Sequence, residues 1–349
     1  MVSAPQKVTM YTIAEELGVS VAAVSRAFDP NSQLKPQKRQ IILETAERLG
    51  YVPNKMASRL SGAPIRIGVL IYGSIAAYYN EYIEGIHAAH AEFVDYKIDL
   101  DLRLLEARKH SIEEAYAVLD HFCTGGYGGV IISGLCKRPH LERLNRLSDS
   151  NVRFIIMDTD LDGCKRDGVA MNDVTTAAKM AAQLLRCAMG DGGDVAVFAG
   201  SVDNLSQQSL LSAFRSAAEG YGNRIAALYH TENDPEMAEQ AVCHMMENYP
   251  NIAGIYVSTA NSIPICRAIE QAGLSGRIKM VTSDIFTELN ECIRRGTVFA
   301  TIYQNPFSQA HDAFEELFFH LVDKSEIREF ILAKPLAVLE SNLNLYEKT

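Results

Sequence analysis

The side chains of this sequence best suited to hold a small molecule stand just after apolar runs typical of β-strands. Asp284 follows one such run, where its carboxylate could accept hydrogen bonds from two hydroxyl groups. Tyr78 and Tyr79 follow the first run, and an aromatic face packs well on the C–H side of a sugar ring. Planar polar groups combined with aromatic rings are typical of polyol recognition. The candidate ligand-binding residues of this kind are Tyr78, Tyr79, Asn204, Gln208, Asn261 and Asp284.

Two of these assignments have purely structural alternatives. Tyr78 and Tyr79 could instead pack against the helix that follows the first strand. Asp284 could instead cap a helix predicted from Ile285 to Arg294, because Asp is a favoured N-cap residue.

The patterns that could hold a metal or a nucleophile are incomplete. Asp158-Thr-Asp160-Leu-Asp162-Gly163 opens like a calcium-binding loop, but its twelfth position is Val169 and not the bidentate Glu. We interpret it as a turn between two lobes. The sequence contains no GxSxG, P-loop or HExxH motif. We therefore expect no catalytic residue, no metal and no cofactor.

Apolar runs alternate with helical segments of 10–15 residues from Ile65 onward. This alternation predicts parallel βαβ units, whose strands lack strict alternation because helices cover both faces of the sheet. The predicted strands are Arg66–Tyr72, Asp99–Leu105, Gly129–Ser133, Arg153–Met157, Asp194–Ala199, Arg224–Tyr229, Ile252–Ser258 and Lys279–Thr282.

Eight or more such units exceed one doubly wound sheet, so we predict two α/β lobes within residues 63–349. Lobe 1 comprises about 63–160 plus 304–333, and lobe 2 comprises about 163–303 plus the C-terminal strand. The segment Asp158–Cys164 would cross between them. Ligands of such sheets bind beyond the carboxyl ends of the strands, so one cleft between the lobes would hold the site.

Residues 1–52 predict a compact all-α head. Thr12, with Glu15 three residues later, forms a capping-box start, and Gly18 allows a tight turn. Ser20 is a plausible N-cap for a second helix, Val21–Phe28. A third helix, from Lys35 to Gly50, would pack behind the first two. Two short helices around a Gly turn indicate a helix-turn-helix, although other helical hairpins share this pattern.

Charge is divided unevenly along the chain. The net charge is −10, but residues 1–62 hold eight Lys and Arg against five Asp and Glu, which gives +3. The remaining residues hold 25 against 38, which gives −13. DNA would repel the acidic part, so any nucleic-acid contact must lie on the head.

The composition is that of a globular chain, with 48% hydrophobic residues among 349. Residues 1–7 carry no apolar run, so we expect no signal peptide, and no stretch is long enough for a membrane span. Seven Cys without CxxC pairs favour reduced thiols. We expect a cytoplasmic protein that does not contact a membrane.

The head contains Val8-Thr9, Ala14, Gly18-Val19-Ser20, Val24-Ser25-Arg26, Arg39, Gly50-Tyr51, Pro53-Asn54, Ala57 and Leu60. With this combination of residues it resembles the lactose-repressor (LacI/GalR) family of bacterial transcription regulators. The resemblance implies that residues 53–62 form a hinge helix that folds on operator DNA, with Leu60 wedged into the minor groove.

The resemblance also implies which residues touch DNA. Val21 and Ala22 match two positions that face base edges, where small apolar groups contact thymine methyls, and Arg26 would reach guanine. The candidate DNA-binding residues are Thr9, Tyr11, Ser20, Val21, Ala22, Ser25, Arg26, Lys38, Asn54, Ala57 and Leu60. Phosphate contacts from Lys35, Arg39, Lys55 and Arg59 are also expected.

From Ile65 to about Tyr346 the chain is similar to periplasmic sugar-binding proteins, a fold that this family joins to its DNA head. One segment that carries this similarity is Ala300-Thr-Ile-Tyr-Gln304-Asn-Pro306. The similarity adds Gln304 to the implied ligand residues. Many relatives carry a ligand-gripping arginine where Gln208 aligns. This departure weakens the expectation of an anionic ligand.

These features predict a homodimeric, ligand-responsive regulator, acting as a repressor on a palindromic operator of carbohydrate or related metabolism genes. Its effector would be a sugar, a polyol or a related molecule. One alternative is an α/β enzyme with an accessory DNA-binding head. A transport binding protein is disfavoured by the expected lack of a signal peptide.

Overall fold

The computed structural model describes residues 10–28, 32, 34–49, 51, 64–73, 76–232 and 234–346; the side chains of residues 10, 11, 25, 76–78 and 95 lie outside the description. The chain divides into a helical head and a larger α/β body, and each is described by itself. The predicted fold class is confirmed. The residues of the expected hinge helix, 53–62, lie outside the described residues.

The head contains α1 (Met10–Leu17), α2 (Val21–Ala27) and α3 (Pro36–Arg48) around one small apolar core. Gly18 makes the turn between α1 and α2 with a φ of +61°. Ser20 is confirmed as the start of α2, because its Oγ accepts a hydrogen bond from the backbone N–H of Ala23 at 3.2 Å. The buried core residues are Ile13, Ala14, Val24, Ala27, Ile42 and Ala46.

The predicted start of α1 was wrong. The helix begins at Met10, so Thr12 lies inside it, exposed, rather than at its N-cap. Packing of α1 against α2 and α3 fixes the extent of so short a helix more strongly than a local capping pattern does. An ion pair between Arg48 and Glu16 also joins α3 to α1.

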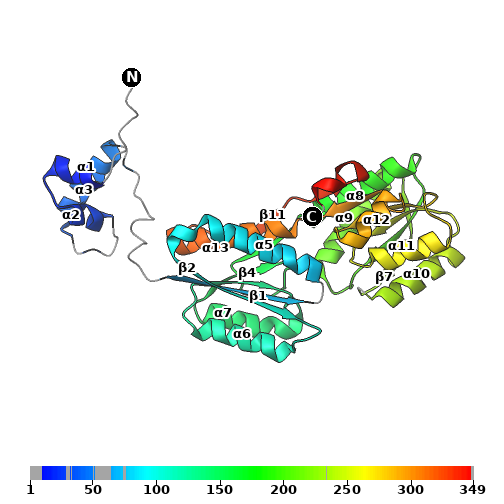
Figure 1. The fold of residues 1–349 in the computed structure, drawn as a ribbon, viewed down its shortest axis with the longest axis horizontal. Helices are drawn as coiled ribbons and strands as arrows, with labels where there is room; N and C mark the ends of the chain where they lie inside the picture. Colours follow the sequence, from blue (N-terminus) through cyan, green and yellow to red (C-terminus); the bar gives the residue numbers. More distant parts are fainter. Residues whose placement is uncertain are drawn as a thin grey trace, which may run out of the picture. The chain divides into compact units, whose positions relative to one another are not determined.

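The first lobe of the body is a six-stranded parallel sheet between two helical layers. The order is β11 (Phe330–Ala333), β5 (Gly168–Asn172), β4 (Arg153–Met157), β3 (Gly129–Ser133), β1 (Ile65–Gly73) and β2 (Ile98–Glu106). Helices α5 (Ala76–Glu92) and α13 (Pro306–Asp323) cover one face, and α6 (Ile112–Thr124) and α7 (Leu141–Asp149) cover the other (Figure 1).

The second lobe repeats this plan. Its sheet runs β12 (Leu336–Val338), β10 (Ala300–Tyr303), β9 (Lys279–Ser283), β8 (Ile252–Val257), β6 (Asp194–Ala199) and β7 (Arg224–His230), and only β12 is antiparallel to its neighbour. Helices α8 (Val174–Met189) and α9 (Leu205–Gly220) pack on one face. Helices α10 (Pro235–Asn248), α11 (Ser262–Gln271) and α12 (Thr287–Arg294) pack on the other.

Short 3₁₀ turns at Val94–Tyr96, Arg138–His140 and Glu340–Leu345 complete the described elements. No described helix has the combination of length and hydropathy that crossing a membrane requires. All seven cysteines are free thiols.

The predicted crossing between the lobes at Asp158–Cys164 was wrong. Strand β5 follows this segment and pairs with β4 in the first sheet, so the first lobe continues to Asn172. Strand β5 was not predicted, because its five residues, GVAMN, begin with Gly and end with Asn, and both are depleted in strands. The chain crosses between lobes after β5, after β10 and again between β11 and β12.

Candidate ligand-binding site and nucleic-acid interface

A cavity of about 800 Å³ lies between the lobes of the body. Residues that follow β4 and β5 of the first lobe line it, together with residues that follow β6, β8, β9 and β10 of the second. It thus lies beyond the carboxyl ends of the strands, as expected for doubly wound sheets, and its size suits a small molecule. Of the candidate ligand residues, Tyr79, Asn204, Asp284 and Gln304 line this cavity.

Asp284 and Gln304 meet at this cavity. The side-chain amide of Gln304 donates to the carboxylate of Asp284, with Nε2 at 2.8 Å from both oxygens. Burial raises the pKa of Asp284 to about 7; the hydrogen bond from Gln304 opposes this shift, while the charges of Asp158 and Glu81 add to it. The carboxyl group is therefore close to half protonated at neutral pH.

Asp284 does not cap the helix that follows it. Helix α12 begins at Thr287, and its N-cap position is Phe286, without a side-chain capping bond. The capping alternative is thus excluded by the geometry. Asp284 has a φ of +69°, and its backbone N–H donates to the carbonyl of Ile302 at 2.8 Å, which holds the residue against strand β10.

The ring of Tyr79, a residue of α5, packs against the backbone of β1 at Gly73. A side chain at Gly73 would overlap this ring. Burial, and then the charge of Asp158, raises the pKa of the Tyr79 hydroxyl above its usual range. The hydroxyl therefore stays protonated and can donate a hydrogen bond. Tyr78 lies in α5, but its side chain is outside the described residues.

Three further candidates have structural partners. The side chain of Asn204 caps α9 by accepting from the N–H of Gln207 at 3.1 Å. Gln208 is exposed and donates to the carbonyl of Val202 at 2.6 Å, and it does not line the cavity. Asn261 is 3% exposed and donates to Thr231 Oγ1 at 2.9 Å; its neighbour Ala260 lines the cavity instead. A ligand role for these residues stays a prediction.

Several polar residues that line the cavity were not predicted as ligand residues, among them Asn172, Gln207 and Asp158. Asn172 is 3% exposed, and neither its Oδ1 nor its Nδ2 has a partner among the described residues. Gln207 lines the cavity one position before the predicted Gln208, and it exchanges hydrogen bonds with Ser258. Asp158 follows β4, so the rule that polar residues after strands form the site could have found it.

The head presents the predicted reading face of α2. Ala22 and Arg26 are exposed and Val21 is partly buried against the head core, whereas Val24 points inward and is fully buried. Ser20 and Lys38 are also exposed. Arg39 has a structural role, because its Nε donates at 2.9 Å to the carbonyl of Ala27 at the end of α2. Thr9, Asn54, Ala57 and Leu60, and the side chains of Tyr11 and Ser25, lie outside the described residues.

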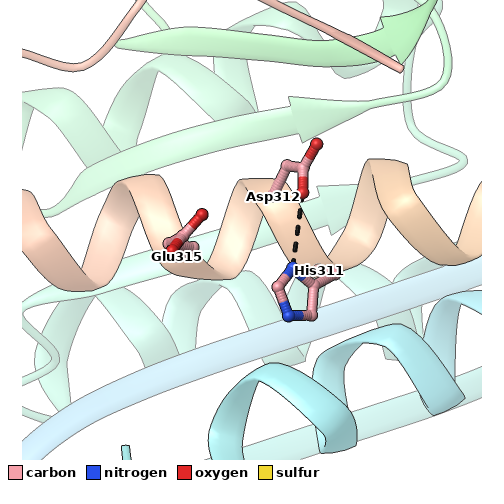
Figure 2. Close-up of side chains that lie close together, drawn as sticks. All are labelled: His311, Asp312 and Glu315. Carbon is pink, nitrogen blue, oxygen red and sulfur yellow. Dashed lines mark hydrogen bonds and ion pairs between the residues drawn. The ribbon is translucent and has the colours of Figure 1, made fainter. Parts of the chain in front are cut away.

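One cluster away from the cavity has residue types that ligate metals. His311, Asp312 and Glu315 lie within one turn of α13, and Figure 2 shows Asp312 hydrogen-bonded to His311. Both ring nitrogens already have carboxylate partners: Nε2 lies 3.0 Å from Glu92 of α5, and Nδ1 lies 3.3 Å from Asp312. We interpret the cluster as an ion pair that ties α13 to α5.

The fold and the cavity define a two-lobed ligand-binding domain joined to a helix-turn-helix head. The model of a periplasmic binding protein domain matches residues 67–325, and that of bacterial regulatory proteins of the lacI family matches residues 9–54. The chain therefore joins a helix-turn-helix domain of the lacI family to a periplasmic-binding-protein domain, which accounts for most of its length. The lacI-family model that matches the head describes bacterial regulatory proteins.

Catabolite control protein A of Priestia megaterium is 33% identical over 141 residues, which cover 40% of this chain and 41% of that protein, so the chain spans less than half of this relative. The HTH-type transcriptional regulator DegA of Bacillus subtilis is 20% identical over 280 residues, or 77% of this chain and 78% of DegA. A solved glucose-galactose binding protein from Geobacillus stearothermophilus superposes with a TM-score of 0.71 at 20% identity, over 80% of this chain and 99% of that one.

Proposed function

We propose that this protein is a ligand-responsive, sequence-specific transcription regulator that acts in the cytoplasm as a homodimeric repressor. Two heads would read the halves of a palindromic operator of carbohydrate or related metabolism genes, because a dimer with two-fold symmetry matches a two-fold DNA site. A sugar, a polyol or a related molecule in the cavity would be the effector.

The observation that carries this proposal is the pairing of two sites in one chain. The head turns Ala22 and Arg26 of α2 toward solvent, and the body has an inter-lobe cavity with the Asp284–Gln304 pair at its wall. An exposed second helix of this kind is what a helix-turn-helix inserts into the major groove. A cavity between two lobes gives the effector a means to favour one lobe arrangement over another.

The effector changes DNA affinity only by binding the DNA-competent state more tightly, or more weakly, than the other state. We propose that this difference is transmitted through residues 53–62 as a hinge that orders on the operator. The predicted contacts of Asn54, Ala57 and Leu60 belong to this part of the proposal.

Selection of binding sites from random duplexes with the full chain tests the regulator directly. The expected result is enrichment of a near-palindromic sequence whose half-sites differ when Val21 and Ala22 are replaced. A pool without an enriched sequence, at a salt concentration where non-specific binding is weak, would contradict the proposal.

A further inference from the structure

Two aspartates occupy equivalent positions in the two lobes. The strand order is the same in both sheets, which places β4 in the first lobe where β9 lies in the second. Asp158 directly follows β4, and Asp284 directly follows β9. Both have a left-handed backbone, with φ of +79° and +69°, and their N–H groups donate at 2.9 and 2.8 Å to the carbonyls of Ala170 and Ile302 in the neighbouring strands.

This shared local structure brings one carboxylate to the cavity from each lobe. Both residues line the cavity, and their charges are close enough for Asp158 to disfavour the ionised form of Asp284. Like charges that face each other across a cleft oppose its closure unless a proton or a positive group lies between them.

The described residues that line the cavity are more often acidic than basic. Among the described lining residues, six are acidic and two are basic, and the two basic residues, Lys137 and Arg138, are exposed. The guanidinium of Arg166 is already held by Asp160, at 3.0 and 2.7 Å. An anionic ligand is therefore disfavoured. With a neutral polyol, the repulsion between Asp158 and Asp284 is relieved only while one carboxyl group is protonated, whereas a cation can lie between two ionised carboxylates.

Asn172 is an independent sign of a ligand at the same cavity. Its side chain is 97% buried and lines the wall, and both polar atoms of its amide lack a partner among the described residues. A buried amide without partners is costly, so a ligand that supplies both a donor and an acceptor would repay that cost. A molecule with amine and hydroxyl groups carries both.

We propose that the effector is a hydroxylated amine whose protonated nitrogen lies between Asp158 of the first lobe and Asp284 of the second. This inference rests on the proposed function and names its ligand class. An ammonium group offers three donors and no acceptor, which matches two acceptor carboxylates and the Oδ1 of Asn172. Tyr79 would add an aromatic face, which attracts cations.

Binding of such a cation releases a proton. In the ligand-free protein the Asp284 carboxyl group is close to half protonated near neutral pH, whereas the ammonium ion binds the ionised form, so the protonated fraction must release its proton. Affinity should therefore rise as the pH increases from about 6 to about 7. A neutral ligand would not require this release.

Matched pairs of compounds test the proposal on the full chain without DNA. Calorimetry at about pH 7 compares glucosamine with glucose, galactosamine with galactose and mannosamine with mannose, in two buffers of different ionisation enthalpy. We expect at least one amine to bind about tenfold more tightly than its hydroxyl counterpart, with proton release to the buffer.

Asp158→Asn and Asp284→Asn should each remove this preference, because both substitutions keep the shape and delete the charge. Asp234→Asn is the matched control, since Asp234 caps α10 outside the cavity and Asn caps equally well. Melting curves check that each variant is folded.

Three results would overturn the proposal: no binding by any of the amines at millimolar concentration, hydroxyl compounds that bind as tightly in every pair, or an amine preference that survives both cavity substitutions. None of these results would contradict the proposed function as a DNA-binding regulator. That proposal fails only if binding-site selection yields no enriched operator.

Discussion

Asn172 is a residue at which ligand binding and stability are opposed. Its buried amide has no described partner, so Asn172→Leu, which is close in volume, should raise the free energy of unfolding of the ligand-free protein by about 1–2 kcal/mol. Urea unfolding measures the change, and the same variant should bind cavity ligands more weakly. A loss of stability with unchanged ligand binding would show that the amide is satisfied within the protein.

His311 makes stability depend on pH. Burial disfavours its charged form, but the hydrogen bonds and charges of Glu92 and Asp312 outweigh burial and hold the pKa of His311 above its usual 6.5. Because the folded pKa is raised, the stabilisation is fully present below about pH 6.5 and is lost as the pH rises through the folded value.

His311→Gln should therefore cost up to about 1 kcal/mol of unfolding free energy near pH 6 and much less near pH 9. Urea unfolding of both proteins at the two pH values measures this difference. An equal cost at both values would mean that packing, and not the ion pair of α13 with α5, is what the histidine contributes.

At the scale of elements, α2 should determine which operator is bound. Ala22 is exposed and Val21 partly so, and their small apolar side chains offer thymine-methyl contacts without hydrogen bonds. The double substitution Val21→Tyr/Ala22→Gln should change the preferred half-site in binding-site selection, by about 1–3 kcal/mol per altered base pair. An unchanged half-site would remove these residues from the readout.

The segment 53–62 carries a prediction that rests on the sequence and the family resemblance. Leu60→Ala should weaken binding to the selected operator strongly and reduce DNA bending, with little effect on non-specific binding, which depends on phosphates. Gel-shift titration and a bend-angle assay compare the two proteins. Equal affinities and bend angles would mean that the segment is only a tether.

Most elements could be predicted from the sequence because their signals are local. Strand β3 (Gly129–Ser133) is an unbroken buried run, and Ser20 starts α2 as its residue type predicts. Strand β5 could not be predicted, since its pairing with β4 and β11 stabilises a short sequence with weak strand propensity.

The ligand-binding site was predicted only in part, because some of its residues depend on contacts between distant segments. Asp284 follows a strong strand signal, whereas Asn172 ends the missed strand β5. Asn261 also follows a strand, but its amide binds Thr231, a contact between distant segments that no local pattern reveals.

In the whole molecule, the proposed regulation requires a coupling between the body and the head. Three crossings of the chain link the lobes, so a ligand in the cavity can bias how the lobes are arranged. The proposed coupling is reciprocal: if the effector weakens operator binding, the operator weakens effector binding by the same factor. Calorimetric titration of an effector into the protein–operator complex should show this equality.

Fluorescence anisotropy of the selected operator tests whether a ligand in the cavity changes the affinity of the head for DNA. The full chain is titrated onto labelled DNA with and without a saturating compound that binds the cavity, for the wild type and for Asp284→Asn. We expect a change of about tenfold or more in the operator Kd of the wild type, a coupling of about 1.4 kcal/mol, and little change in the variant. An operator Kd that stays the same while the compound occupies the cavity would contradict the proposed coupling.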